Sequence, residues 1–274
     1  MTIFSATIAS ATDFPVGAVR LLAAAATAAA APDLTASPLP ELRVGDVLDG
    51  EGLSLRVLES CWLTGSPSRL CWRLEVLESA GADGEPTGPV EFSVRREGFA
   101  LAWITLSDKG AAGLREDESG PLVGRLVAER LALRAERGFL LPDEEGGLRS
   151  LLGRLALEEG YDLIVTTGGT GVAPRDVTPE ATLRILDKRL AGFERAMTAA
   201  SLAKTPFGAG SRAVAGTVGR SLMINLPGSP RAVAECLEPI LPILLHTLEK
   251  LHGDPADCAD VRLTPGLADH GPRC

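Results

Sequence analysis

The stretch YDLIVTTGGTG, residues 161–171, joins a continuous apolar run to a segment of three threonines and three glycines. An uninterrupted apolar run with Ile and Val at its centre is typical of a β-strand covered on both faces, as in a parallel sheet. Open parallel sheets bind ligands beyond the carboxyl ends of their strands. The stretch therefore predicts a buried parallel strand that ends in a ligand-binding loop.

The glycine-rich segment, residues 166–171, offers backbone N–H groups and hydroxyls without bulky side chains. Because glycine lets the backbone approach a ligand closely, such a segment suits a small anion. It is neither the phosphate loop GxxxxGK[ST] nor the dinucleotide pattern GxGxxG. A glycine-rich turn that binds no ligand stays an alternative for this segment taken alone.

Apolar and amphipathic segments alternate along the chain after Gly98. We expect strands at 99–106, 139–141, 161–166, 213–218 and 221–226. We expect helices at 122–137, 148–158, 179–186 and 229–251, the last of them broken near Pro239 and Pro242. Thr178 is the expected N-cap of the third helix, with Pro179 at its first position. This order predicts an α/β fold with a mostly parallel sheet and helices on both faces.

Two further loops follow strands of the predicted sheet. Residues 225–230, NLPGSP, lead into the last helix, with Ser229 as N-cap and Pro230 at the first helical position. Residues 107–121 follow the first strand, and Ser119 either caps the next helix or contacts a phosphate. Helix capping without a ligand is the alternative for both loops. Because all three loops follow parallel strands, we expect them to meet at one edge of the sheet.

Two carboxylates fall at the same predicted edge. Asp143 follows the short strand at 139–141, and Asp176 follows the glycine-rich segment. Mg²⁺ binds one or two carboxylates together with phosphate oxygens, so this pair suits phosphoryl or nucleotidyl transfer. Turn formation is the alternative for Asp143, and local capping of the helix after Thr178 is the alternative for Asp176.

The first 98 residues have a different pattern of predicted secondary structure. An Ala-rich helix and a Pro-rich connector are expected within residues 1–40, followed by short strands between residues 42 and 94. The predicted domains are a small β-rich one at 1–98 and an α/β one at 99–252, followed by a flexible tail at 253–274. Cys61 and Cys71 are interpreted as buried structural cysteines, with contact to a sulfur-bearing ligand as the alternative.

Composition limits the classes of partner. The net charge of −9 argues against a broad nucleic-acid surface, which needs clustered Lys and Arg. No apolar run approaches the roughly 20 residues of a membrane span, and the stretch 21–31 is too short for one. Five cysteines without a CxxC spacing indicate neither a zinc site nor a disulfide framework. We expect a cytoplasmic protein in a reducing compartment.

Six segments, in this order and spacing, resemble one known family over about residues 100–250. They are Ser107–Asp108, Asp117–Gly120, Pro142–Glu144, Thr166–Gly171, Arg175–Ala181 and Asn225–Pro230. The family is that of the MogA-type molybdopterin adenylyltransferases, which includes the MoaB proteins and the gephyrin G domain. Segment 192–198 departs from the family pattern, so no role is carried over to Glu194. Residues 1–98 are loosely similar to small β domains fused to molybdenum-cofactor proteins, including the MOSC type, but carry no motif of them.

The resemblance implies a homotrimer that transfers AMP from Mg-ATP to the phosphate of molybdopterin and releases pyrophosphate. Hand-over of the product to a molybdenum insertase is also implied. A non-catalytic pterin carrier of the MoaB type is the alternative. By resemblance, Asp143 and Asp176 are the catalytic and Mg²⁺-binding residues. The implied substrate-binding residues are Ser107, Asp108, Ser119, Gly120, Thr167, Gly168, Gly169, Thr170, Gly171, Pro227, Gly228 and Ser229.

Overall fold

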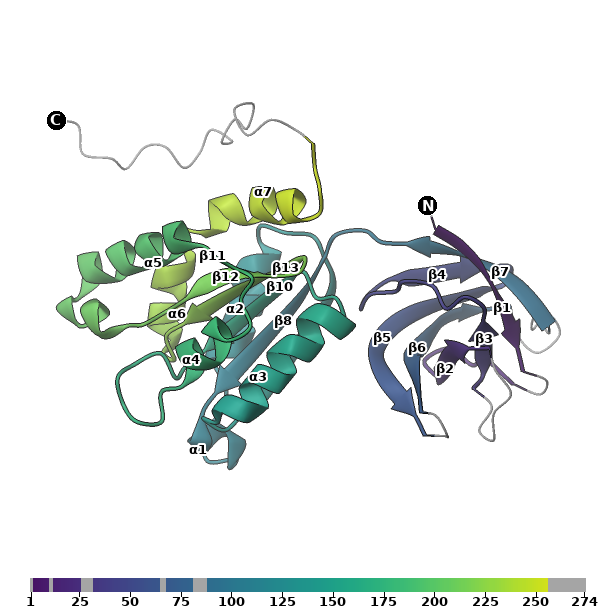
Figure 1. Cartoon of the computed structure of the whole chain (residues 1–274), viewed down its shortest axis with the longest axis horizontal. Coiled ribbons are helices and arrows are strands. Elements are labelled where there is room, and N and C mark those ends of the chain that lie inside the picture. The colour runs from purple at the N-terminus through teal and green to yellow at the C-terminus, as the bar shows by residue number, and fades with distance from the viewer. Residues whose placement is uncertain (1, 10–11, 26–31, 65–67, 81–87, 256–274) are drawn as a thin grey trace.

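A β-barrel and an α/β unit lie side by side in the computed structural model of this chain (Figure 1). The structure describes residues 2–9, 12–25, 32–64, 68–80 and 88–255. The predicted flexible tail lies almost wholly outside them. Within the described residues, no helix is long and apolar enough to cross a membrane.

Seven strands form the barrel. They are β1 (Thr2–Ile8), β2 (Val19–Ala24), β3 (Leu34–Ala36), β4 (Val47–Gly50), β5 (Leu53–Leu63), β6 (Arg69–Ser79) and β7 (Gly88–Arg95). Their order is β1-β3-β2-β6-β5-β4-β7, and antiparallel pairing of β1 with β7 closes the barrel. Alternate residues of β5, such as Leu53, Leu55 and Val57, point into a core that also buries Phe14 and Phe92. The barrel interior is therefore a packed core.

The Ala-rich helix expected within residues 1–40 is wrong for the described residues. Val19–Ala24 form strand β2, which pairs with β6 and β3. Leu22 is buried in the barrel core, which offers its side chain more apolar contact than an isolated helix would. Residues 26–31, the rest of the alanine run, lie outside the described residues.

The second sheet has six strands. They are β8 (Phe99–Leu106), β9 (Leu133–Leu141), β10 (Leu163–Thr167), β11 (Lys188–Arg189), β12 (Ala215–Val218) and β13 (Ser221–Leu226). The order is β11-β12-β13-β10-β8-β9. Strands β9, β8, β10 and β13 run parallel, whereas β12 and β11 pair antiparallel. The sheet is thus mixed, because β12 and β13 form a hairpin that turns at Gly219, where φ is +54°.

Helices cover both faces of this sheet. They are α1 (Asp108–Ala111), α2 (Ser119–Ala128), α3 (Glu145–Gly153), α4 (Thr178–Leu183), α5 (Ala191–Lys204), α6 (Pro230–Leu237) and α7 (Leu241–Leu251), with a π-turn η1 (Arg154–Glu158) and a 3₁₀ turn η2 (Pro206–Gly210). Side chains of α2, α5, α6 and α7 pack in one core, and side chains of α3, η1 and α4 pack in another. The predicted break of the closing helix is confirmed, since α6 ends at Leu237 and α7 begins at Leu241.

The second half of one expected helix is wrong, and α5 was not among the expected helices. The helix expected over 122–137 ends at Ala128, and β9 begins at Leu133. The sequence pattern of this region fits a helix, but residues from Leu133 onward pair with β8 along its whole length. Non-local pairing therefore overrides the local periodicity here.

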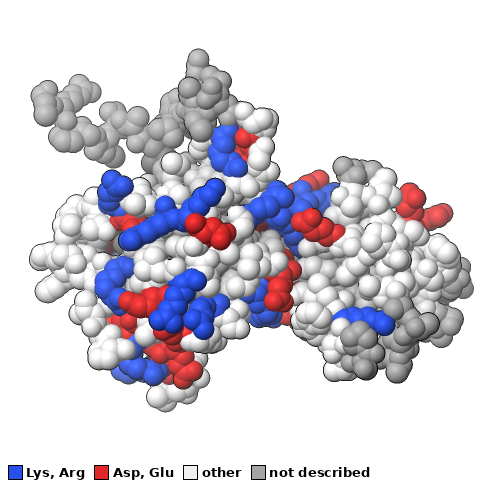
Figure 2. All heavy atoms as spheres, in the orientation of Figure 1, with Lys and Arg blue, Asp and Glu red and all other residues white. Residues whose placement is uncertain are grey.

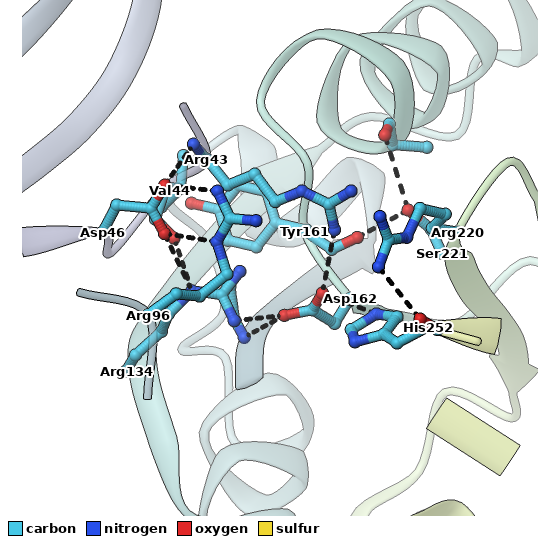
Figure 3. Close-up of polar contacts among 12 residues, drawn as sticks. Arg43, Val44, Asp46, Arg96, Arg134, Tyr161, Asp162, Arg220, Ser221 and His252 are labelled. Atoms are coloured by element: carbon cyan, nitrogen blue, oxygen red, sulfur yellow. Dashed lines mark hydrogen bonds and ion pairs between the residues drawn. The ribbon is translucent and has the colours of Figure 1, made fainter. Parts of the chain in front are cut away.

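Two buried aspartates lie at the junction of the barrel and the α/β unit (Figure 3). Asp46 Oδ1 is 4.0 Å from Nε of Arg134, and Asp162 Oδ1 is 3.6 Å from Nη1 of Arg43, so each aspartate faces an arginine of the other unit. Asp46, which precedes β4, accepts hydrogen bonds from Nε and Nη2 of Arg96, both at 2.6 Å. Asp162, which precedes β10, accepts from Nη1 of Arg134 at 2.6 Å and from the backbone N–H of Ala100 at 2.7 Å. Because neither aspartate is exposed, each needs its arginine partner to offset the loss of water.

The junction also has polar contacts that cross it directly. Arg134 of β9 donates to the carbonyl oxygen of Val44 at 3.0 Å, and Arg137 donates to Glu59 of β5 at 2.7 Å. Figure 2 shows charged side chains of both signs over the α/β unit and the junction, whereas this face of the barrel is largely uncharged. The three-residue connection from β7 to β8 is therefore reinforced by ion pairs.

Candidate active site

The loops after β8, β9, β10 and β13 lie at one edge of the sheet, because these strands are parallel. A pocket of about 620 Å³ opens there. Its lining includes most of the predicted site residues, namely Ser107, Ser119, Asp143, Gly168, Gly169, Thr170, Gly171, Asp176, Pro227, Gly228 and Ser229. The three loops and the two acids that sequence reasoning selected are therefore neighbours in space.

Three predicted substrate-binding residues lie outside the lining. Thr167 is fully buried, and its hydroxyl donates to Thr105 at 3.2 Å. The backbone N–H of Gly120 donates to Asp117 at 3.0 Å. The carboxylate of Asp108 is held by Arg175, through Nε at 3.0 Å and Nη2 at 2.5 Å. These groups support the pocket wall in the structure rather than face its interior.

The glycine-rich segment crosses the sheet edge with its backbone close to other loops. Gly168 and Gly169 have φ values of +92° and +62°, which side-chain-bearing residues rarely adopt. The N–H groups of residues 169–172 donate no hydrogen bond within the described part of the chain. Consecutive backbone donors of this kind suit an anion.

Thr178 holds this segment in place. Its hydroxyl donates to the carbonyl oxygen of Gly168 at 2.9 Å, and its N–H donates to that of Gly169 at 3.1 Å. Its predicted role as the N-cap of α4 is wrong, since Val177 occupies that position and no side chain caps the helix. The hydroxyl that was expected to cap α4 instead fixes the backbone of the glycine-rich segment.

The loops before α2 and α6 touch each other. The hydroxyl of Ser119 donates to the carbonyl oxygen of Gly228 at 2.8 Å. Gly228 in turn approaches Gly168 so closely that a Cβ on Gly228 would lie 3.2 Å from the Cα of Gly168. The predicted capping by Ser229 is confirmed, because its hydroxyl accepts from the N–H of Ala232.

Asp117 is a supporting residue that sequence reasoning did not single out. One carboxylate oxygen accepts from the N–H groups of Ser119 and Gly120, at 3.1 and 3.0 Å, and the other accepts from the hydroxyl of Thr105 at 2.8 Å. Ser119 is thus the first residue of α2, not its cap. An aspartate two residues before Ser-Gly is a signal for this turn that could have been used.

Asp143 and Asp108 are joined by two reciprocal hydrogen bonds, each from a backbone N–H to the other residue's carboxylate. The N–H of Asp108 donates to Asp143 Oδ2, and the N–H of Asp143 donates to Asp108 Oδ1, both at 3.1 Å. The hydrogen bond from Arg175 holds the pKa of Asp108 below its usual value. Burial raises the pKa of Asp143, and the charges of Asp108 and Asp176 act in the same direction.

This electrostatic arrangement fits a divalent cation. The Asp143 and Asp176 carboxylates both line the pocket and repel each other, so a cation between them and a ligand phosphate would stabilise their charged forms. No group of three or more metal-ligating side chains occurs among the described residues. A Mg²⁺ ion held here would therefore draw further ligands from substrate phosphates and water, as Mg²⁺ commonly does.

Glu194 has a local structural partner. Its carboxylate accepts from Nε and Nη2 of Arg189 at 2.8 and 2.9 Å, and from the N–H of Ala215 at 3.2 Å. Glu194 thus takes part in an ion pair beside β12.

Phe207, Ser211 and Arg115 also line the pocket. Sequence reasoning missed them because they lie in irregular segments without a motif. Phe207 is 88% exposed, which is unusual for an aromatic side chain. The pocket thus combines backbone donors, several acids that include Asp143 and Asp176, the cation Arg115 and an exposed aromatic ring.

Comparisons with known proteins match this half of the chain. The family described as "Probable molybdopterin binding domain" matches residues 102–246. A molybdopterin adenylyltransferase of Helicobacter pylori is 38% identical over 152 residues, which are 55% of this chain and 86% of that protein. The molybdenum cofactor synthesis protein cinnamon of Drosophila melanogaster is 37% identical over 58% of this chain, but the match spans only 26% of that longer protein.

Solved structures agree with the sequence comparisons. The molybdopterin biosynthesis enzyme MoaB of Thermus thermophilus superposes with a TM-score of 0.53 and is 43% identical. The match covers 58% of this chain and 99% of the MoaB chain.

Proposed function

The chain belongs to the molybdopterin-binding family of molybdenum cofactor biosynthesis, and from this premise we propose that it is a molybdopterin adenylyltransferase. It would transfer AMP from ATP to the terminal phosphate of molybdopterin. The observation that carries the proposal is the convergence of three strand-end loops and two acids, Asp143 and Asp176, on one pocket. The 38% identity to an adenylyltransferase favours this activity over a carrier role.

The reaction needs little covalent help from the protein. A phosphate oxygen of molybdopterin attacks the α-phosphorus of ATP, a new P–O bond forms, and the bond to the leaving pyrophosphate breaks. Positioning of the two phosphate groups and neutralisation of their charge supply most of the rate enhancement in such transfers.

The residues of this chain divide that work. The N–H groups of residues 169–172, together with the loops at Ser119 and Gly228, would bind the pterin phosphate. Asp143 and Asp176 would hold Mg²⁺, which when bound neutralises charge on the triphosphate. Asp108 and Arg175 would orient Asp143, since Asp108 contacts both.

Product analysis tests the proposal. Purified protein is incubated with molybdopterin, radiolabelled ATP and Mg²⁺, and AMP incorporation into molybdopterin is measured. We expect incorporation by the wild type and by Glu129→Gln, an exposed acid at the far end of α2, and its loss in Asp143→Asn. Molybdopterin binding without incorporation would assign the carrier role of the alternative instead.

The proposal extends to the whole protein. By resemblance we infer a cytoplasmic homotrimer that delivers its product to a molybdenum insertase, and sedimentation analysis would measure the oligomeric state. We also infer that residues 1–98 and 99–252 are separate domains. The support for this division is that the barrel core holds only residues from before Gly98 and the α/β cores hold only residues from after it, apart from Val44, which packs with the α/β unit at the junction. The similarity of the barrel to the MOSC type stays a prediction.

A further inference from the structure

Arg212 lies behind the glycine-rich segment, between η2 and β12, where the sequence has no recognised motif. Its side chain makes three polar contacts. Nε donates to the carbonyl oxygen of Gly171 at 2.7 Å, and Nη2 donates to that of Asp176 at 2.7 Å. Nη1 donates to the carboxylate of Glu180. Its backbone N–H also donates to the carbonyl oxygen of Thr170 at 2.9 Å.

These contacts determine which way two consecutive peptide groups face. In a planar trans peptide the C=O and the following N–H point in opposite directions. Because Arg212 binds the carbonyl oxygens of Thr170 and Gly171, the N–H groups of Gly171 and Val172 point away from Arg212. Gly171 and Val172 line the pocket, and Arg212 does not. The two donors are thereby aimed at the pocket side.

The same guanidinium also reaches the segment that carries a proposed metal ligand. Its bond to the carbonyl oxygen of Asp176 fixes the main chain from which the carboxylate projects. The carboxylate of Asp176 folds back to accept from the N–H of Ala173 at 2.7 Å, so residues 170–176 form one braced loop. One side chain therefore braces both the predicted phosphate donors and one of the two acids.

Glu180 neutralises the charge of Arg212 on the side away from the pocket. The contribution of Arg212 to the pocket is accordingly one of geometry rather than of charge. A lysine could not replace it, because an ammonium lacks the planar fork that reaches two carbonyl oxygens and a carboxylate at once.

We propose that Arg212 is a positioning residue that orients the phosphate-binding N–H groups of residues 171 and 172 and the acid Asp176. The inference rests on the proposed function only in the identity of the substrate. Its physical content, that the loop binds a phosphate group and that Arg212 preorganises it, is independent of adenylyl transfer.

The test uses the full chain and inorganic phosphate as the probe, with the dissociation constant obtained from the phosphate dependence of thermal unfolding. We expect Arg212→Ala and Arg212→Lys to weaken phosphate binding by about tenfold or more, since a fixed donor geometry is lost. Added guanidinium at low millimolar concentration is expected to restore part of the affinity in Arg212→Ala but not in Arg212→Lys.

Two control variants separate positioning from folding. Arg189→Ala removes an arginine that is similarly paired, with Glu194, but contacts no loop of the pocket. Glu180→Gln keeps the carbonyl contacts of Arg212 and removes only its ionic partner. We expect both to bind phosphate within about twofold of the wild type, because exposed ion pairs contribute little.

Molybdopterin turnover gives a second readout. For Arg212→Lys we expect a raised KM for molybdopterin together with a lower kcat, because both the donors and Asp176 move. Phosphate binding of wild-type strength in both Arg212 variants, or a wild type that binds no phosphate, overturns the inference. If the wild type binds phosphate but transfers no AMP, only the proposed function fails.

Discussion

Replacing Asp162 with asparagine would remove one buried charge from the junction and leave its shape nearly unchanged. The wild-type carboxylate accepts from Arg134 at 2.6 Å and from the N–H of Ala100 at 2.7 Å, and it lies 3.0 Å from Nε2 of His252 (Figure 3). An asparagine oxygen can still accept from Ala100. Arg134, whose side chain is 4% exposed, would keep its carbonyl acceptors and the more distant carboxylate of Asp46, whose Oδ1 is 4.0 Å from Nε of Arg134.

The cost follows from that burial. Removing one partner of a buried ion pair typically costs 3–5 kcal/mol, because the other charge is left uncompensated. Since the carbonyl groups of Val44 and Gly98 still accept from Arg134, we expect the free energy of unfolding to fall by about 3 kcal/mol, at the low end of this range. For a chain of this size that corresponds to a fall in Tm of roughly 6–12 °C.

Activity at 25 °C is expected to be unchanged. Asp162 precedes β10 and the glycine-rich segment follows it. The five residues of β10 separate them by about 17 Å. Urea unfolding and AMP incorporation would be measured on the same preparations of Asp162→Asn and wild type. Glu41→Gln is the control, because Glu41 is 85% exposed and 3.8 Å from Arg43, so its loss is expected to cost less than about 1 kcal/mol.

The pH dependence gives an independent check. Burial acts to raise the pKa of Asp162, but His252, Arg134 and the N–H of Ala100 together hold it below its usual value. A carboxyl with a lowered folded-state pKa contributes stability above its unfolded-state pKa near 4, which is lost as pH falls further. The difference in the free energy of unfolding between the wild type and Asp162→Asn is therefore expected to narrow below about pH 4. Equal stability of the two proteins at pH 7 would refute the reasoning.

Three further outcomes follow from the site and its surroundings. Asp176→Asn is expected to abolish AMP incorporation, whereas its molybdopterin affinity, measured by equilibrium binding, is expected to stay near that of the wild type. Unchanged turnover would remove Asp176 from the mechanism. Gly168→Ala is expected to lower the free energy of unfolding by about 2 kcal/mol and to weaken molybdopterin binding, because φ of Gly168 is +92° and the new Cβ would meet the carbonyl oxygen of Leu106. Urea midpoints and binding constants equal to those of the wild type would contradict this. Burial raises the pKa of Glu159 to about 7, so its contribution favours the folded state below its unfolded-state pKa near 4.5 and is lost as pH rises through about 7. Urea midpoints are expected to decline less between pH 5 and 8 in Glu159→Gln than in the wild type. An equal decline of the urea midpoint with pH in both proteins would count against the raised pKa of Glu159.

The pocket could be predicted from sequence because its parts are local. Each strand and the loop that follows it, such as Gly168–Gly171 or Gly228 and Ser229, are contiguous in the sequence and can be recognised there. Parallel strands then bring such loops to one edge of the sheet. The supporting contacts of Thr178 were interpreted as helix capping, because a threonine before Pro179 carries the same local signal in both cases. Arg212 had no signal, since it acts on carbonyl groups that any residue possesses.

The barrel and the junction could not be predicted to the same degree. Strand β2 owes its conformation to pairing with β6, some 50 residues away, and its alanines locally favour a helix. The ends of β9 were likewise decided by β8 rather than by the periodicity of Leu133–Arg137. Asp46 and Asp162 lie more than a hundred positions apart, and nothing near either residue indicates that both meet arginines at one interface.

The barrel meets the α/β unit where parallel strands begin, at Arg134 near the start of β9 and at Asp162 just before β10, and this placement has an evolutionary consequence. Substitutions across most of the barrel surface leave the chemistry untouched, so the two halves are free to diverge at different rates. The residues that meet at the junction are expected to change together, because replacing Asp46 or Asp162 also removes an ionic partner of an arginine in the other half, Arg134 or Arg43 respectively. Covariation between the halves of related chains would accordingly concentrate on this small buried set.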